Sequence, residues 1–195
     1  MSALPDPLSA FHSLERHVES LPEGVNAEIA SGIYMMTPRP RVRHSRVQVR
    51  LLRWLGEYPE AEVLPGERPD WLFLLEPELR FEAAFSRLIP DVAGWRRSTN
   101  GWPGPDESLI ERMPEWVAEV SSPGSEAADR GVKKTAYGLM GIAWLWIVDP
   151  DERLVETFGN VRGRMLPERV AHAGETLLGP PFEAFPLDVA SLFVV

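Results

Sequence analysis

Apolar positions follow two different periods along the first sixty residues of the chain. In segments 7–22 and 42–58, apolar side chains recur every three or four residues, the spacing of one face of an α-helix. These two segments are therefore predicted to form amphipathic helices. Between them, residues 26–36 predict two short strands around a turn at Ser31 and Gly32.

The middle of the chain predicts a sheet. Short segments rich in aromatic and branched residues, separated by proline and glycine, predict strands at 61–65, 70–75, 78–85, 87–95 and 114–122. A helix is expected at 125–141, ending at Gly141, and a nearly continuous apolar strand at 142–149. Strand, helix and strand in this order form a crossover unit, so the strands at its two ends should be parallel.

The end of the chain predicts an antiparallel meander. Segments 153–158 and 161–166 follow expected turns at Pro150–Asp151 and at Gly159–Asn160. Together with the upstream elements, this pattern predicts a mixed α/β (α+β) fold in which helices flank a central mixed sheet.

Composition fits one globular domain. The 195 residues are 44% hydrophobic and 25% charged, with neither a repeat nor a long linker, so we expect a single domain over 1–195: an N-terminal helical arm over 1–22 and a core over 23–195. The absence of cysteine excludes disulfides, thiolate metal sites and a cysteine nucleophile, and suits a reducing compartment. No apolar run approaches the roughly 20 residues of a membrane span, so a soluble, cytoplasmic protein is expected.

Charge is distributed unevenly. The net charge is −9, yet residues 39–53 hold six arginines and no acid, a segment that we call the basic strip, whereas residues 101–129 hold seven acids and one arginine. The net charge excludes a purely electrostatic DNA binder. The chain also lacks the phosphate-binding, dinucleotide-binding, zinc-protease and esterase motifs GxxxxGK[ST], GxGxxG, HExxH and GxSxG.

Two acidic residues lie inside apolar predicted strands, Asp91 in RLIPDVAGW and Glu119 in PEWVAEVSS. Buried carboxylates are costly unless they are compensated, and alternation allows both to reach one point between neighbouring strands, where a divalent cation would compensate them. The alternative is that each acid is a partly exposed edge residue or is paired with an arginine.

Lysine is rare in this chain. Eighteen of the twenty basic residues are arginine, and the only lysines are Lys133 and Lys134. A lysine provides a compact point charge with an adjustable proton, and Lys133 lies on the crossover helix that runs back over the Glu119 strand, so its ammonium could approach the carboxylates. The alternative is a solvated pair of lysines on the helix surface.

These residues lie in a longer resemblance. The segments PDVAGW, PEWVAEVSSP and DRGVKKTAYGLMGIAWLWIVDP resemble the Uma-two family of restriction endonucleases, and NAEIASGIYMMTPRPRVRH is similar to the upstream part of that family's pattern. The resemblance covers about residues 26–158. It implies the PD-(D/E)XK nuclease fold, a restriction-endonuclease-like α/β core that uses a divalent metal to cut phosphodiesters.

The resemblance also implies roles for individual residues. Asp91 and Glu119 would bind the metal, Lys133 would be the active-site lysine, and Glu28 would be an additional acid. The usual superfamily pattern places the lysine two positions after the second acid, where this chain has Ser121. Three further positions match the family: His44, with no role derived, and Asp129 and Tyr137, which lie four residues on either side of Lys133 and are expected to hold the lysine and pack the helix.

The first functional hypothesis is a nuclease that cuts DNA. Asp91, Glu119 and the carbonyl of Val120, together with Glu28, would hold Mg²⁺ or Mn²⁺, and Lys133 would orient or deprotonate a water molecule. The expected phosphate contacts on the basic strip are Arg41, Arg43 and Arg46, with His44 among them. DNA is the expected partner, a second copy of the chain is a further one, and no membrane is expected.

The second hypothesis is a non-catalytic relative that keeps the fold as a binding or regulatory module. The net charge of −9 favours it, and Trp95 and Trp102, at the borders of a loop rich in glycine and proline, could then form a partner surface. Trp144 and Trp146 are expected in the core. A glycosidase using Asp91 and Glu119 is a third possibility, but it leaves Lys133 without a role.

Overall fold

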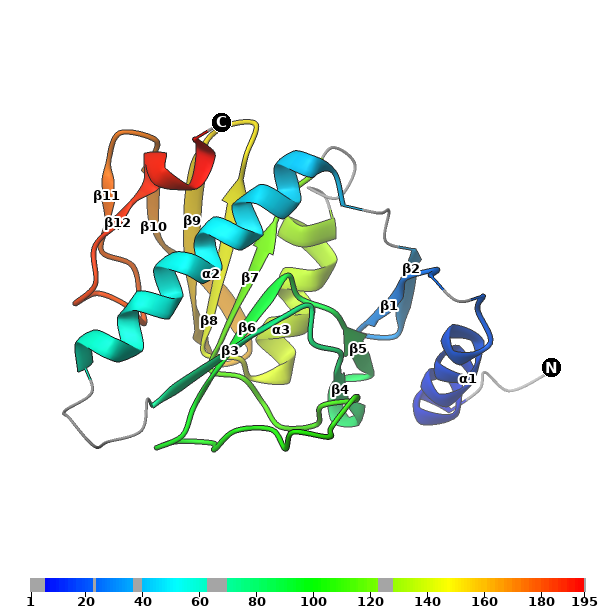
Figure 1. Cartoon of the computed structure of the whole chain (residues 1–195). Helices are drawn as coiled ribbons and strands as arrows, with labels where there is room; N and C mark the ends of the chain where they lie inside the picture. The colour runs from blue at the N-terminus through cyan, green and yellow to red at the C-terminus, as the bar shows by residue number, and fades with distance from the viewer. Residues whose placement is uncertain (1–5, 23, 37–39, 63–69, 123–127, 195) are drawn as a thin grey trace.

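A six-stranded mixed sheet forms the centre of the molecule in the computed structural model, which describes residues 6–22, 24–36, 40–62, 70–122 and 128–194 (Figure 1). Its strand order is β10 (Arg164–His172), β9 (Leu154–Val161), β8 (Trp144–Asp149), β7 (Trp116–Val120), β6 (Val92–Arg96) and β3 (Trp71–Leu75). The β7–β8 pair is parallel and the other neighbours are antiparallel. The predicted crossover and the predicted mixed sheet are both confirmed.

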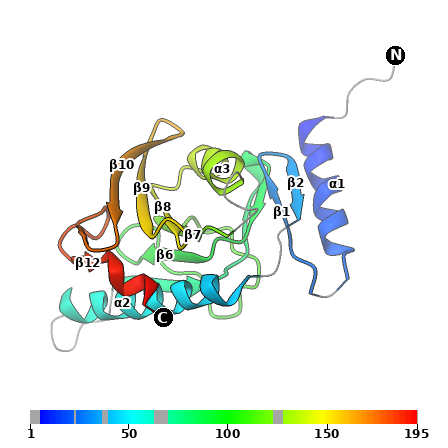
Figure 2. The same cartoon turned by 90° about the horizontal axis from the view of Figure 1, so that it is seen from above.

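Two helices cover opposite faces of this sheet (Figure 2). Helix α2 (Val42–Glu62) packs Leu51 and Leu55 against one face, over a core that includes Trp116 and Trp146. Helix α3 (Lys134–Met140) packs on the other face. It ends at Gly141, whose φ of 90° is the left-handed conformation that glycine adopts readily.

A second, smaller sheet lies beside α3. Its order is β2 (Ile33–Met36), β1 (Ala27–Ala30), β5 (Ser86–Leu88) and β4 (Leu79–Phe81), all antiparallel. The first hairpin turns at Ser31 and Gly32, both with positive φ, as predicted. The remaining short elements are η1 (Glu82–Ala84), η2 (Ala128–Lys133, π-helical), β11 (Thr176–Leu177), β12 (Leu187–Asp188) and η3 (Val189–Phe193).

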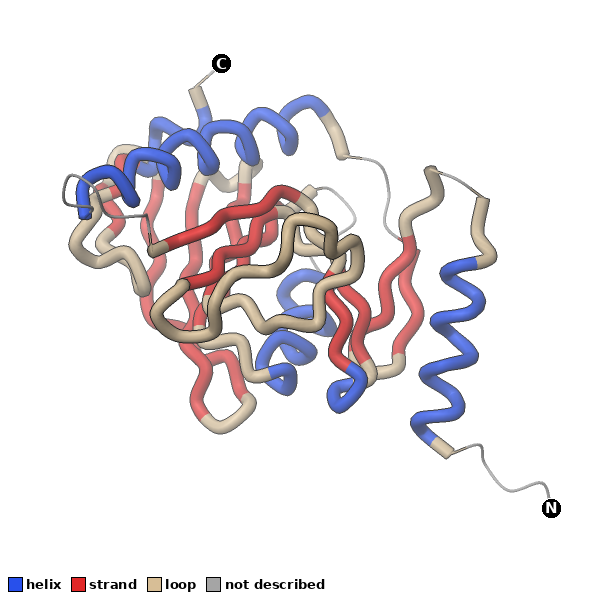
Figure 3. The backbone as a smooth tube through the Cα atoms, turned by 60° about the horizontal axis from the view of Figure 1, so that its bottom comes forward, coloured by secondary structure: helices blue, strands red, loops and turns tan. Residues whose placement is uncertain are grey.

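Helix α1 (Pro7–Glu19) lies alongside the smaller sheet, on the side away from the large one (Figure 3). It begins at Pro7, preceded by Asp6, whose carboxylate accepts a hydrogen bond from the backbone N–H of Ser9 at 3.2 Å. Phe11 is its fully buried apolar anchor.

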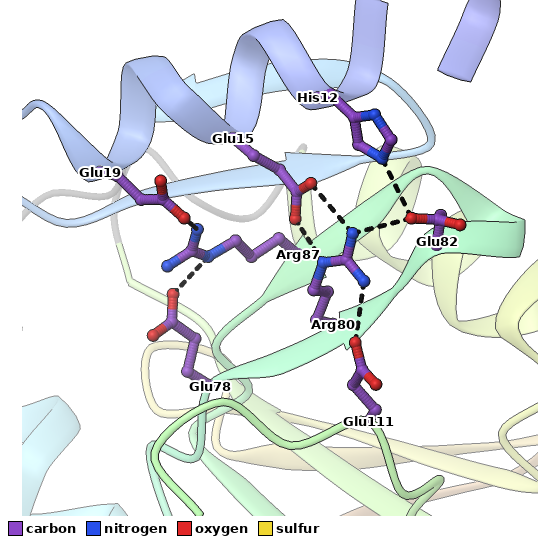
Figure 4. A network of polar contacts seen from close by, with 8 residues as sticks. All are labelled: His12, Glu15, Glu19, Glu78, Arg80, Glu82, Arg87 and Glu111. Carbon is purple, nitrogen blue, oxygen red and sulfur yellow. Dashed lines mark hydrogen bonds and ion pairs between the residues drawn. The ribbon is translucent and has the colours of Figure 1, made fainter. Parts of the chain in front are cut away.

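Two arginines of the smaller sheet bind α1 through carboxylates (Figure 4). Arg80 on β4 donates to Glu15 at 2.6 Å and also to Glu82 and Glu111. Arg87 on β5 donates to Glu78 at 2.6 Å and to Glu19 at 3.1 Å. The Glu15 hydrogen bond is the largest cause of a pKa of Arg80 raised above its ordinary value, so this guanidinium remains charged.

Four predictions about local structure are wrong. Segment 87–95 is not one strand: β5 ends at Leu88 in the small sheet, and β6 starts at Val92 in the large one. Segment 78–85 is a three-residue strand followed by a 3₁₀ turn, and Gly159–Asn160 lies inside β9, so the hairpin turns at Arg162–Gly163 instead. The expected strand at 61–65 is helical at 61–62, and the rest of it lies outside the described residues.

The tryptophans differ in part from their predicted places. Trp146 is buried in the core, as predicted, and Trp144 packs against it. Trp95 is also fully buried and donates to the carbonyl of Arg112 at 2.9 Å, so it is not part of a partner surface. Trp102 is partly buried under the guanidinium of Arg97. Within the described ranges, none of the helices combines the length and the apolar character needed to span a membrane.

Candidate functional site

The two predicted acids are neighbours where β6 and β7 meet. Val92 on β6 is paired with Ala118 on β7; Asp91 directly precedes the first of these residues and Glu119 directly follows the second. Asp91 therefore lies at the break between β5 and β6, whereas the sequence analysis predicted that it lies inside a strand. Its carboxylate accepts a hydrogen bond from the backbone N–H of Val120 at 2.5 Å, which joins Asp91 to the residue next to Glu119.

Lys133 lies between two buried glutamates. Its Nζ is 3.1 Å from Oε1 of Glu119 and 3.0 Å from Oε2 of Glu28, and all three side chains are at most 6% exposed. Glu28 comes from β1 of the smaller sheet, so the cluster joins the two sheets and η2. The crossover brings Lys133 to Glu119, one of the two carboxylates that the sequence analysis expected it to approach, and the other carboxylate in contact is that of Glu28.

The two adjacent lysines have different surroundings. Lys133 is the last residue of η2 and points into the buried cluster, whereas Lys134 begins α3 and places its Nζ 4.9 Å from the ring centre of Phe158. Consecutive helical residues differ in direction by roughly 100°, so only one of the two can enter the site. The alternative of a solvated lysine pair is therefore wrong for Lys133.

Both glutamates have a second hydrogen-bond donor. The hydroxyl of Tyr137, which is fully buried on α3, donates to Oε1 of Glu119, the oxygen that also contacts Lys133. The backbone N–H of Ile89 donates to Oε1 of Glu28 at 2.8 Å. Tyr137 thus contacts Glu119 at the oxygen that Lys133 also contacts, whereas the side chain of Asp129 lies outside the described residues.

Asp91 is held from the other side of the sheet, by α2. Nε2 of His44 lies 3.0 Å from its carboxylate, and Nε2 of Gln48, one helical turn later, donates to Oδ1 at 2.9 Å. The same Gln48 nitrogen donates to Glu76 at 3.1 Å. His44 and Gln48 are both buried. His44, expected among the phosphate contacts of the basic strip, instead contacts an acid of the site.

The arginines of the basic strip that the structure describes lie just before α2 or along it. Arg43 is largely exposed and pairs with Asp151, which follows the end of β8, while Arg46 donates to the carbonyl of Val194 at 3.3 Å. Arg41 is exposed just before the helix starts. An open groove of about 570 Å³ runs along the outer side of α2, away from Asp91; it is lined by Pro40, Val42, Ser45, Arg46, Val49, Arg50 and Arg53.

A further arginine, close in sequence to Lys133, forms ion pairs with carboxylates of β8 and β9. Arg130 of η2 donates to Glu156 at 2.7 Å and to Asp149 at 3.1 Å. Burial alone would lower the pKa of Arg130, but the bonds to these two carboxylates outweigh that effect and raise it. The cation is therefore permanent and fixes η2, and Lys133 with it, to the sheet.

The donor set has the chemistry of a site for a hard divalent cation. Asp91 accepts the hydrogen bond of the Val120 N–H and Glu119 directly precedes Val120, and Mg²⁺ and Mn²⁺ prefer carboxylate oxygen ligands. The hydroxyl of Ser121 is buried and has no hydrogen-bond partner among the described residues, so another oxygen donor is present two residues after Glu119. Over the same residues, no group of three or more His, Cys, Asp or Glu side chains is arranged to hold a metal.

Sequence reasoning missed Gln48 and Glu76. Gln48 is the only glutamine of the chain and lies four residues after His44, so the two share one face of α2. Its polar character within the buried face of a predicted helix is the signal that could have found it. Glu76 is identified only by the fold, because the β3–β6 pair brings it beside Asp91.

The comparisons with known proteins agree with this fold. No match is found among curated proteins. Among solved structures, a crystal structure described as a "putative nuclease belonging to DUF820" from Anabaena variabilis is similar with a TM-score of 0.71 and 19% identity; the alignment covers 97% of this chain and 98% of that one. At this identity the likeness shows the fold. The family model Uma2, described as "Putative restriction endonuclease", matches residues 8–190, and the chain therefore belongs to the Uma2 family.

Proposed function

We propose that the protein is a metal-dependent endonuclease that hydrolyses phosphodiester bonds in DNA. The observation that supports this proposal most is the buried contact of Lys133 with Glu119 and Glu28, next to Asp91. A cluster of one lysine and several acids is costly to bury, and catalytic sites are among the places where such clusters occur. Membership of the Uma2 family supports a nuclease.

The residues proposed to hold the metal are Asp91 and Glu119, with the carbonyl of Val120 and with Glu28 as an additional acid. A bound Mg²⁺ or Mn²⁺ would lower the pKa of a water molecule and neutralise charge on the phosphate. The chain's own contribution is to fix these oxygens in advance: Val120 N–H holds Asp91, and Tyr137 holds Glu119.

Lys133 is proposed to orient or deprotonate the attacking water. As an ammonium, Lys133 has three donors and can only orient the water; to take a proton from it, the nitrogen would first pass one of its own protons to Glu119 or Glu28, whose oxygens lie 3.1 Å and 3.0 Å away. An arginine could not replace it, because a guanidinium does not release its proton at physiological pH.

The phosphate contacts are proposed at the start of α2. The contact between His44 and Asp91 brings this end of the helix to the site, so Arg41 and Arg43 are the cations of the basic strip next to it. Arg46 lies on the outer side of the helix and would contact DNA only if the duplex extends around α2. Contacts of this kind position DNA without reading its sequence.

A non-catalytic module is the second candidate, and one observation favours it. Lys133 already forms ion pairs with Glu119 and Glu28 without a metal, so the chain itself compensates part of the buried negative charge. In such a module, the fold would serve binding only.

The test is a comparison of DNA cleavage with metal binding. We expect purified protein to nick supercoiled plasmid in Mg²⁺ or Mn²⁺, and the metal to raise the melting temperature, because a ligand that binds only the native state stabilises it. Asp91→Ala and Glu119→Ala should lose both effects. The Lys134→Met variant, altered beside the site but not in it, should keep both.

One result would separate the two candidate functions, and a second is a control for a contaminating nuclease. A wild-type protein that neither cleaves DNA nor gains stability from millimolar Mn²⁺ would favour the binding module. Cleavage that persists in Asp91→Ala at the wild-type rate would show that the nuclease activity belongs to a contaminant.

A further inference from the structure

Gln48 is a buried, uncharged residue whose amide lies between two carboxylates. Its side chain is 3% exposed, and its Nε2 donates to two different carboxylates, to Asp91 at 2.9 Å and to Glu76 at 3.1 Å. An amide nitrogen carries two hydrogens, so each carboxylate receives one. The opposite orientation would place the amide oxygen against two carboxylates that can only accept, so no hydrogen bond would form. The amide is therefore oriented with its nitrogen toward the two acids.

The second carboxylate is itself held in place. Glu76 follows the end of β3, with a φ of 47°, a left-handed conformation that is uncommon for a residue other than glycine. Its backbone N–H donates to the carbonyl of Asp91 at 3.1 Å. Glu76 and Asp91 are therefore joined twice, once through the backbone and once through the amide of Gln48.

The hydrogen bonds around Asp91 limit what else its carboxylate can bind. An ionised carboxylate offers about four acceptor positions. Donors among the described residues use three of them, namely the N–H of Val120, Nε2 of His44 and Nε2 of Gln48. Because an ionised carboxylate only accepts, Nε2 of His44 must carry its proton when it bonds to Asp91. About one acceptor position then remains for a cation.

We propose that Gln48 is a positioning residue that, with Glu76 as its anchor, fixes Asp91 as a ligand with a single free acceptor position for the divalent cation. The inference rests on the proposed function, because it concerns the cation expected there. Carboxylates that ligate metals are themselves commonly held by hydrogen bonds, and removing such a partner typically costs about 10- to 100-fold in metal affinity. Gln48 would thus tune affinity without touching the metal or the substrate.

The test measures Mn²⁺ binding to the whole chain by calorimetry. Gln48→Met keeps the length of the side chain and removes both donors, so the dissociation constant for Mn²⁺ should rise about 10- to 100-fold. Glu76→Ala removes only the anchor and should cause a smaller rise. Val47→Ala is the matched control: it truncates a buried neighbour on α2 that packs in the core, so it should lower the melting temperature and leave Mn²⁺ affinity unchanged.

The outcomes are distinguishable. Wild type that binds Mn²⁺, with Asp91→Ala unable to bind and Gln48→Met binding as tightly as wild type, would overturn the positioning role alone. Equal losses of affinity in Gln48→Met and Val47→Ala would also overturn it, because the effect would then follow stability. Wild type that takes up no Mn²⁺ at millimolar concentration would overturn the proposed function together with this inference.

Discussion

Removing the ammonium of Lys133 should destabilise the protein strongly in the absence of metal. In Lys133→Met, Glu119 and Glu28 lose the cation that lies 3.1 Å and 3.0 Å from them, while the side-chain volume is nearly preserved. Breaking a buried ion pair by removing one partner costs about 3–5 kcal/mol. For a chain of this length, about 1 kcal/mol shifts the melting temperature by about 2–4 °C, so we expect a loss of about 6–20 °C.

Lys134→Met is the matched control. Its ammonium lies over the ring of Phe158 at 4.9 Å and has no carboxylate partner among the contacts that the structure describes. The loss of such a cation–π contact costs about 0.5–1 kcal/mol at a site that is partly exposed. Its melting temperature should therefore fall by about 1–4 °C.

The assay is thermal unfolding in a chelator, followed by the fluorescence of the seven tryptophans. A Lys133→Met/Glu28→Gln double variant should be more stable than Lys133→Met alone, because it removes one of the uncompensated charges. Mn²⁺ should also restore part of the lost stability. Equal melting temperatures for the Lys133 and Lys134 single variants would refute the reasoning, as would a double variant that is less stable than Lys133→Met.

Two further predictions concern the surface of the molecule. The pKa of Glu82 lies below its ordinary value of 4.5, mainly because of the hydrogen bond from His12 and then because of the one from Arg80. The ionised Glu82 therefore contributes to the docking of α1 above about pH 4.5, and this contribution is lost as the pH falls through the lowered pKa. The protection factors of the α1 amides, which correct exchange for its intrinsic pH dependence, should accordingly fall at acidic pH, and less so in Glu82→Gln; identical profiles of protection against pH would contradict the assignment. Replacing Arg41 and Arg43 by alanine should weaken DNA binding and reduce the slope of log affinity against log salt by about one unit per phosphate contact, which filter-binding titrations measure, whereas an unaltered slope would show that these arginines do not contact DNA.

The hydrophobic pattern of the sequence predicted the part of the site that is built from segments close together in the chain. The apolar run of β8 and the glycine stop at Gly141 defined the crossover, and the crossover placed Lys133 over the strand of Glu119. This contact needs only right-handed connectivity and helix geometry, both of which the sequence pattern contains.

The contacts that the sequence analysis predicted wrongly or did not predict involve the smaller sheet and α2. Pro90 has no N–H for a ladder, and Ile89 gives its N–H to Glu28, so the segment breaks there although its apolar pattern continues. No local pattern shows that β1 brings Glu28 to Lys133. His44 was interpreted through the charge of its neighbours, whereas its helical phase, shared with Gln48 and Leu51, decides that it is buried.

The π-helical form of η2 has a consequence for sequence change within the family. A π-turn contains one residue more than the α-turn that it replaces, so it is equivalent to a single-residue insertion that the helix has absorbed. Deleting Gly131, whose missing side chain would meet open space, should return the segment to α-helical geometry and rotate everything before it by roughly 100°. Lys133 would keep its direction, whereas Arg130 would turn away from Asp149 and Glu156. Relatives that are one residue shorter at this point should therefore retain the direction of the lysine and lack the arginine pairing that fixes η2 to the sheet.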